Sequence, residues 1–294
     1  MHRFKYFNSL INDWKILIMD NEQYNIELII GSGASACKDY DDLFLNVKIG
    51  LENGIRGFDT APSYQTEEIL GKAIRESLYE LEISRNDIFI QTKIDPWQMQ
   101  YENGNIIKFV DEALCKMKFD YLDSLLIHWP IPEYFEYTWR YLCKLREDGI
   151  LKNIGICNVR SWNIYKFNEL DVMPDIIQIE RHPLRICEKE LDLCAHNNIT
   201  VQAYSPLCKM NNKLKNSNTL KNIARKYNKS VGQVILRWHI DSGVIPVFTS
   251  TKPNRIKEYS QIFDFCLTSN EIREINLLNQ NWKLYLESCI CPGL

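Results

Sequence analysis

Four residues in the first half of the chain have side chains that can move a proton or hold a carbonyl oxygen: Asp59, Tyr64, Lys93 and His128. A tyrosine hydroxyl, with an ordinary pKa of about 10, is a poor proton donor near neutral pH. A lysine ammonium beside it stabilises the phenolate, and a carboxylate holds that lysine in position. A neutral imidazole can then orient a carbonyl oxygen. This set suits carbonyl reduction, in which a hydride reaches carbon as a proton reaches oxygen.

The elements that must position these residues repeat a short apolar strand followed by a helix of polar pattern. We expect strands at 28–31, 57–61, 88–92, 124–129, 153–157, 176–180, 200–204 and 244–248. The helices centre on 41–52, 66–80, 107–118, 137–148, 161–169, 187–197, 218–239 (in two pieces) and 253–262. Right-handed crossovers make successive strands parallel, so this repeat favours a closed (β/α)8 TIM barrel over a doubly wound sheet. No linker divides the chain, which predicts one domain over residues 1–294.

Active sites of such barrels form at the C-terminal ends of the strands. Asp59, Lys93 and His128 lie at or next to predicted strand ends, and Tyr64 lies in the loop after the second strand. Taken singly, Asp59 fits a turn cap, Lys93 a salt bridge at the barrel mouth, and His128 a hydrogen-bonded core histidine. Their convergence on one rim favours a catalytic role.

The two ends of the chain lie outside this repeat. Residues 1–26 form an N-terminal extension with a short amphipathic helix and a β-hairpin, which we expect at the bottom of the barrel. Residues 276–294 form a C-terminal tail that carries Cys289 and Cys291.

Composition excludes several classes of function. The 35 Lys and Arg residues against 38 Asp and Glu residues argue against a nucleic-acid or anionic-membrane partner. No apolar run approaches the length of a membrane span. The ten cysteines are scattered, without a secretory signal or zinc-ligand spacing, which predicts a cytoplasmic protein with reduced thiols and no metal. We expect a monomer or a weak homodimer.

Seven segments add a resemblance to these inferences. In chain order they read GFDTAPSY (57–64), EEILGKAI (67–74), QTK (91–93), LIHWP (126–130), IGICN (154–158), QIERHP (178–183) and AYSPL (203–207). Together they resemble the signature of the aldo-keto reductases, collinearly from about residue 28 to about residue 275. Members of this family are (β/α)8 barrels that use NAD(P)H to reduce aldehydes and ketones.

The resemblance implies a role for each residue at the rim. Tyr64 would be the general acid, Lys93 would tune its pKa, Asp59 would be the partner of the lysine, and His128 would orient the carbonyl. The residues that would bind the cofactor are Asn158 and Gln178 (carboxamide), Tyr204 (stacking on the nicotinamide), Ser205 and Leu207 (pyrophosphate), and Ser250 and Arg255 (2′-phosphate).

The sequence departs from the family pattern at three cofactor positions. Cys157 stands where a serine is usual beside the carboxamide, Thr249 where a lysine often precedes Ser250, and Tyr259 where an asparagine commonly contacts adenine. These departures predict that NADPH is preferred by a reduced margin and that NADH is also used.

The expected substrate is a small carbonyl compound in an open, shallow pocket. The segments after Pro130, Pro206 and Trp282 are brief, so long loops that would build deep walls are missing. Apolar walls are expected from Trp129, Trp97 and Tyr285.

Two other functions compete with a reductase. One is a non-catalytic NADP(H)-binding redox sensor or regulatory subunit, which the four rim residues disfavour. The other is a barrel lyase that uses Lys93 as a Schiff base, which leaves Tyr64 and Arg255 without a role.

Overall fold

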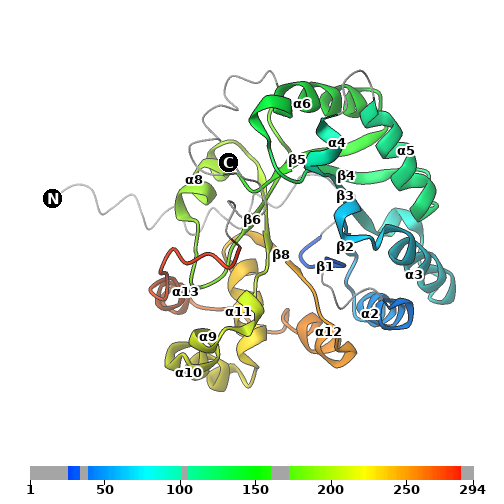
Figure 1. The fold of residues 1–294 in the computed structure, drawn as a ribbon. Helices are drawn as coiled ribbons and strands as arrows, with labels where there is room; N and C mark the ends of the chain where they lie inside the picture. The colour runs from blue at the N-terminus through cyan, green and yellow to red at the C-terminus, as the bar shows by residue number, and fades with distance from the viewer. Residues whose placement is uncertain (1–25, 34–38, 101–104, 160–171, 286–294) are drawn as a thin grey trace.

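A closed barrel of eight parallel strands, β1 to β8 in chain order, forms the centre of the molecule (Figure 1). The computed structural model describes residues 26–33, 39–100, 105–159 and 172–285. The strands are β1 (Ile29–Gly31), β2 (Gly57–Asp59), β3 (Phe89–Ile94), β4 (Leu122–Ile127), β5 (Leu151–Cys157), β6 (Ile176–Glu180), β7 (Thr200–Tyr204) and β8 (Val244–Phe248). β1 pairs with β8 as well as with β2, which closes the barrel.

Helices surround the barrel (Figure 1). They are α2 (Tyr40–Glu52), α3 (Glu67–Glu80), α4 (Pro96–Met99), α5 (Asn105–Met117), α6 (Pro132–Glu147), α8 (Glu188–His196), α9 (Asn212–Asn216), α10 (Asn218–Tyr227), α11 (Val231–Asp241), α12 (Pro253–Ser260) and α13 (Ser269–Asn276). Short 3₁₀ turns form η2 (Pro62–Tyr64), η3 (Arg85–Asp87) and η4 (Cys208–Met210).

Local sequence explains where several helices begin and end. The Asp39 carboxylate accepts hydrogen bonds from the backbone N–H groups of Asp41 and Asp42 and so caps α2. Ser230 and Gln233 form a capping box that starts α11. Just before it, Asn228 adopts φ of +54°, a left-handed conformation that ends α10. The predicted helix over 218–239 is therefore two helices, as expected.

Two apolar layers hold the barrel. A large cluster packs the outward faces of the strands against the helices. A second cluster draws its side chains from six strands and fills part of the barrel interior: Ile29, Phe89, Leu126, Cys157, Ile176 and Val247. Gln91, His128 and Gln178 each lie two residues beyond a member of this cluster, so on these strands the apolar interior gives way to hydrogen-bonding groups toward the strand ends.

The predicted barrel is confirmed, with differences at individual strand ends. The second strand ends at Asp59 instead of residue 61, because Pro62 begins η2. The third strand continues to Ile94, and the fourth ends at Ile127 instead of residue 129.

The structure also contains elements that the sequence did not predict, and some predicted elements lie outside the described residues. Within the described residues the structure adds three helices that we did not predict, α4, α9 and α13, the last of which begins with a capping box of Thr268 and Glu271. The predicted helix over 161–169, the predicted N-terminal helix and hairpin, and Cys289 and Cys291 lie outside the described residues. Among the residues that the structure does describe, the helices are too short or too polar to cross a membrane.

Gly71 allows α3 to approach α5 closely, and its substitution tests this packing. A Cβ atom at Gly71 would lie 2.5 Å from Cα and 2.6 Å from the backbone oxygen of Met117. Alanine favours a helix by about 1 kcal/mol over glycine, but overpacking costs about 1–3 kcal/mol when backbone must shift. We expect Gly71→Ala to lower the free energy of unfolding by up to about 2 kcal/mol in urea denaturation.

The matched control is Gly50→Ala in α2, where the nearest atom is the tip of the Ile30 side chain and the next lies 3.7 Å away. This side chain can move, so Gly50→Ala should cost less than Gly71→Ala. Equal losses in the two variants would show that backbone contact is not the cause.

Candidate active site

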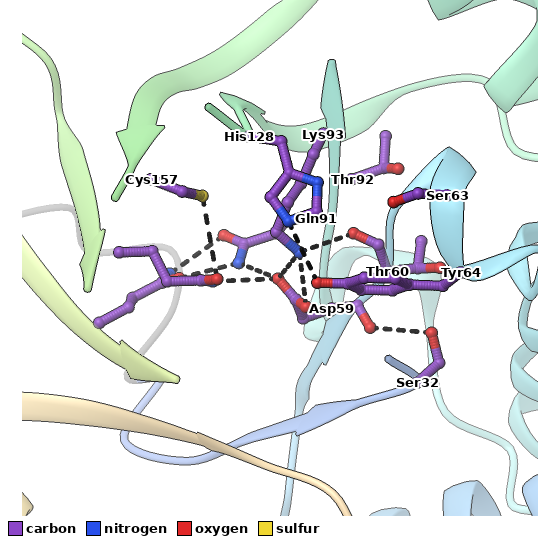
Figure 2. Close-up of polar contacts among 12 residues, drawn as sticks. Ser32, Asp59, Thr60, Ser63, Tyr64, Gln91, Thr92, Lys93, His128 and Cys157 are labelled. Carbon is purple, nitrogen blue, oxygen red and sulfur yellow. Dashed lines mark hydrogen bonds and ion pairs between the residues drawn. The ribbon is translucent and has the colours of Figure 1, made fainter. Parts of the chain in front are cut away.

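A buried ion pair between Lys93 and Asp59 forms the centre of the polar cluster at the strand ends (Figure 2). Lys93 Nζ donates to Asp59 Oδ1 at 2.8 Å, to Asp59 Oδ2 at 2.9 Å and to the Thr60 carbonyl at 2.9 Å. The side chains are 0% and 5% exposed. Burying both charges is costly, and a full set of hydrogen bonds offsets that cost. Despite its burial, the pKa of Lys93 is held above its usual value, chiefly by Asp59.

A layer of three glutamine amides supports this pair from across the barrel. Gln91 Nε2 donates to Asp59 Oδ2 at 2.5 Å, and Gln178 Nε2 donates to the same oxygen at 3.1 Å. Both amides also donate to Gln202 Oε1, at 2.8 and 2.9 Å. The side chains come from β3, β6 and β7, so the layer joins distant sides of the barrel. None of the three was predicted as support for Asp59.

Tyr64 reaches this cluster from η2. Its ring lies against Gly33, where an added Cβ atom would come within 2.7 Å of the ring. Lys93 Nζ lies 4.9 Å from the centre of the ring. Burial raises the pKa of Tyr64 to about 12, against the opposing effect of the Lys93 ammonium. The sequence argument identified the effect of the ammonium but not the larger effect of burial.

His128 follows β4 and faces Tyr64, with its Nε2 atom 3.5 Å from the tyrosine Oη. The two rings meet edge to face, with centroids 5.6 Å apart. Burial and the nearby Lys93 ammonium hold the pKa of His128 below its usual value, although a hydrogen bond to Asp95 opposes this. A neutral imidazole is therefore expected at neutral pH. The four rim residues predicted from the sequence thus lie together.

Asp95 is a member of the site that the sequence analysis missed. It directly follows β3 and is 2% exposed. Its Oδ1 atom lies 2.5 Å from His128 Nδ1. The available signal was an acidic residue directly after a predicted strand end, two positions beyond Lys93.

The residues predicted around the carboxamide lie at the ends of β5, β6 and β7. Asn158 adopts φ of +61°, a conformation that asparagine tolerates, and its Nδ2 atom donates to the His128 carbonyl at 2.9 Å. Tyr204 Oη donates to Asn158 Oδ1 at 2.7 Å. The Cys157 thiol lies 3.9 Å from Gln178 Oε1, and burial raises its pKa, so it stays protonated. This group borders the polar layer around Asp59.

A cleft of about 510 Å³ opens beyond the ends of β7 and β8. All five residues predicted at the pyrophosphate and 2′-phosphate line it: Ser205, Leu207, Thr249, Ser250 and Arg255. Lys209 and Lys215, which the sequence analysis did not select, add two cations to the lining. Among the described residues, the lining includes one acidic side chain, Glu258, against the three cations Arg255, Lys209 and Lys215. These donors and charges fit a ligand that carries several phosphates.

Comparison with known proteins agrees with this geometry. The model of the aldo/keto reductase family matches residues 27–280. The chain belongs to this family.

Individual relatives support the assignment. The chain is 38% identical to the oxidoreductase YtbE of Bacillus subtilis over 86% of this chain and 90% of that protein. It is 36% identical to a glyoxal reductase of the same organism, over 85% of this chain and 88% of the relative. A Bombyx mori aldo-keto reductase solved in complex with NADP superposes with a TM-score of 0.82 at 31% identity, covering 90% of this chain and 92% of that one.

The three predicted substrate walls of this aldo/keto reductase lie in different surroundings. Trp129 is buried beside His128, with ring centroids 6.3 Å apart. Trp97, on α4, is 49% exposed and packs edge to face against Phe109. Among the three, Tyr285 alone lines the cleft that fits phosphates, with its ring centroid 6.1 Å from that of Tyr204.

Glu180, at the end of β6, fixes the tail that carries Tyr285. Its two carboxylate oxygens accept the backbone N–H groups of Leu284 at 2.7 Å and of Tyr285 at 3.0 Å. Glu180 also bonds His182 at 3.1 Å. Although burial opposes it, these hydrogen bonds hold the pKa of Glu180 below its usual value. The tail is thus attached to the barrel mouth through its main chain.

Metal ligands do not gather in the described part of this reductase: no three His, Cys, Asp or Glu side chains there are arranged to hold an ion.

Removal of one member of the buried ion pair should be costly. Lys93→Met leaves the Asp59 carboxylate buried without its cation, and such losses cost about 3–5 kcal/mol. We expect the free energy of unfolding to fall by about this amount in urea denaturation. The double variant Lys93→Met with Asp59→Asn removes the unpaired charge and should recover part of the loss. A single variant as stable as the wild type would contradict this account of the pair.

Proposed function

We propose that this protein reduces a carbonyl compound to an alcohol, with Tyr64 as the general acid. The observation that carries the proposal is the Tyr64 hydroxyl held between the Lys93–Asp59 ion pair and His128. NAD(P)H, when bound, supplies the hydride that reaches the carbonyl carbon. Tyr64 gives its proton to the carbonyl oxygen, and the Lys93 ammonium stabilises the phenolate that remains. His128, whose Nε2 atom lies 3.5 Å from the Tyr64 hydroxyl, would lie beside the same oxygen.

The high pKa of Tyr64 is compatible with this role. A hydroxyl with a pKa of about 12 carries its proton across the whole physiological range. The fixed ammonium, which cannot leave its bonds to Asp59 and Thr60, is already in place when the phenolate charge develops. A charge that is positioned in advance in a water-poor site stabilises a transition state without reorganisation.

The cofactor would be held by two groups of residues. Arg255 and Ser250 would bind the 2′-phosphate, and Ser205 and Leu207 would approach the pyrophosphate in the cleft. At the nicotinamide end, the contacts would come from Asn158, Gln178, Cys157 and Tyr204. Arg255 favours NADPH, whereas Thr249 lacks the charge of a lysine, so we expect NADH to be used as well.

The substrates would be small, reactive aldehydes and ketones. Relatives named glyoxal reductase in Bacillus subtilis and methylglyoxal reductase in Escherichia coli point to short dicarbonyl compounds. An open site with few walls, which the brief segments after Pro130, Pro206 and Trp282 predict, would agree with broad specificity for small carbonyls.

The lyase alternative is disfavoured by the state of Lys93. A Schiff base requires a neutral amine, but Asp59 holds the pKa of Lys93 above its usual value and its side chain is fully buried. A redox sensor without catalysis would need no acid beside its cofactor, which leaves the Tyr64 arrangement unexplained.

Tyr64→Phe tests the proposed acid. The variant loses the proton donor and keeps the ring, so kcat should fall at least about 10²-fold, while cofactor affinity changes only by a few-fold. Rates are measured from NADPH oxidation with methylglyoxal, and affinities from protein fluorescence. Tyr79→Phe, which alters a tyrosine that is 87% exposed, is the matched control and should leave kcat unchanged. Near-normal turnover of Tyr64→Phe would exclude this residue as the acid.

Arg255→Ala and Thr249→Lys test the 2′-phosphate site. Loss of one charged hydrogen bond costs about 1.5–3 kcal/mol, or about ten- to a hundredfold in affinity. Arg255→Ala should therefore erase the preference for NADPH, and Thr249→Lys should tighten NADPH while NADH stays nearly unchanged. Both cofactors are titrated by fluorescence. An unchanged NADPH/NADH ratio in Arg255→Ala would place the 2′-phosphate elsewhere.

A further inference from the structure

The carboxylate of Asp95 is almost completely surrounded by hydrogen-bond donors. Its Oδ2 atom accepts the Ser63 backbone N–H at 2.7 Å, and its Oδ1 atom accepts the Ser63 hydroxyl at 3.1 Å. Oδ1 also lies 2.5 Å from His128 Nδ1. Although burial opposes ionisation, the hydrogen bonds from His128 and Ser63 hold the pKa of Asp95 below its usual value. Because both of its oxygens accept hydrogen bonds from Ser63, Asp95 is ionised and has no proton to donate.

This contact determines which nitrogen of His128 carries a proton. An ionised carboxylate only accepts hydrogen bonds, so Nδ1 must be the donor in the 2.5 Å contact. In the neutral ring Nε2 then has a lone pair. That atom faces the Tyr64 hydroxyl at 3.5 Å and can accept its proton, but it cannot donate a hydrogen bond to a carbonyl oxygen.

We infer that Asp95 is a positioning residue that keeps a proton on Nδ1 of His128, so that Nε2 works as a proton carrier for Tyr64. This inference rests on the proposed function. Neutral His128 accepts a hydrogen bond from Tyr64, and only the imidazolium form has an Nε2–H group that reaches the substrate oxygen. Asp95 supplies the negative charge that stabilises this imidazolium.

The proton balance of the cycle follows. The proton on Tyr64 Oη moves to the substrate oxygen as the carbonyl becomes an alcohol, and a phenolate remains. The imidazolium of His128 returns one proton from Nε2 to Oη, which leaves the neutral ring with its Nδ1–H bonded to Asp95. The ring then regains a proton on Nε2 from solvent, which its 13% exposed side chain contacts. One proton from solvent is thus consumed for each carbonyl reduced.

The charged and titratable groups around His128 determine in which direction the loss of Asp95 shifts the protonation of the ring. Asp95, after β3, and Asp59, on β2, favour the imidazolium, whereas the Lys93 ammonium on β3 opposes it. Tyr64 faces the ring as a neutral phenol below its pKa of about 12. Loss of the Asp95 charge therefore lowers the pH at which His128 gains its second proton. An opposite charge in contact moves such a midpoint by about one to three pH units.

The test combines NMR titration of His128 with the pH profile of kcat. Long-range ¹H–¹⁵N spectra distinguish protonated from unprotonated ring nitrogens, and His128→Gln assigns the signals. In the wild type at pH 7.5 we expect a proton on Nδ1 and none on Nε2. In Asp95→Asn the protonation midpoint should fall by at least about one pH unit. In both proteins kcat should rise as the pH falls through the midpoint of His128. In Asp95→Asn this rise should occur at a pH lower by the same amount, so that at pH 6.5 the kcat of the variant is about tenfold below that of the wild type.

Gln98→Ala separates this role from a structural one. Gln98 Oε1 accepts the backbone N–H of Asp95 at 2.9 Å and stabilises the same turn without contributing charge to His128. This variant should leave the His128 midpoint and the pH profile unchanged, even if the protein unfolds more easily. If Asp95 only stabilised the turn, both variants would lose stability and neither would shift the protonation midpoint of His128.

Two results would overturn the inference: an Nε2–H, Nδ1-unprotonated ring in the neutral wild type, or an unchanged His128 midpoint in Asp95→Asn. The first measurement uses only the wild-type protein, so it does not depend on the folding of a variant. The NMR titration needs neither substrate nor cofactor. A wild type that reduces no carbonyl compound would therefore reject the proposed function, while the titration would still decide the state of His128.

Discussion

The pairing of Lys93 with Asp59 is the constraint on which the mouth of this barrel depends. Two charges buried inside a barrel need protein groups that satisfy their remaining hydrogen bonds. The Thr60 carbonyl completes the shell of the ammonium, and the Gln91 and Gln178 amides complete that of the carboxylate. This requirement explains why a polar layer replaces the apolar filling that such barrels normally carry at this level.

The same layer of glutamines connects the part of the site around Tyr64 with the part that is expected to bind the carboxamide. Gln178 donates to Asp59 through its amide nitrogen, while its amide oxygen faces Cys157. Gln178, which supports Asp59 near Tyr64, is therefore also part of the surface expected to meet the carboxamide. A thiol in this place is a weak hydrogen-bond partner, so it leaves the Gln178 amide to be oriented by Asp59 and Gln202.

Much of this arrangement could be predicted from the sequence because it depends on the local pattern of apolar and polar residues along the chain. Alternation of apolar strands and polar-faced helices specified the barrel, and residues at strand ends had to meet at one rim. The role of Asp95 depends on the turn after β3, which brings it to the histidine that follows the next strand. The pKa of Tyr64 depends on how deeply the ring is buried, which no local pattern records. Tyr285, an expected substrate wall, is held at the cleft by the contact of its backbone N–H with distant Glu180, which no local pattern of the sequence predicts.

The way in which Glu180 holds the tail has a consequence for how this protein can change over evolutionary time. Its carboxylate recognises two main-chain N–H groups, which every residue except proline provides. Side chains at positions 284 and 285 can therefore be exchanged without loss of the anchor. An exchange at position 285, which lines the cleft, presents a new group to it at an unchanged position. The anchor thus separates the attachment of this segment from its chemistry, and ligand preference can drift here while the barrel stays the same.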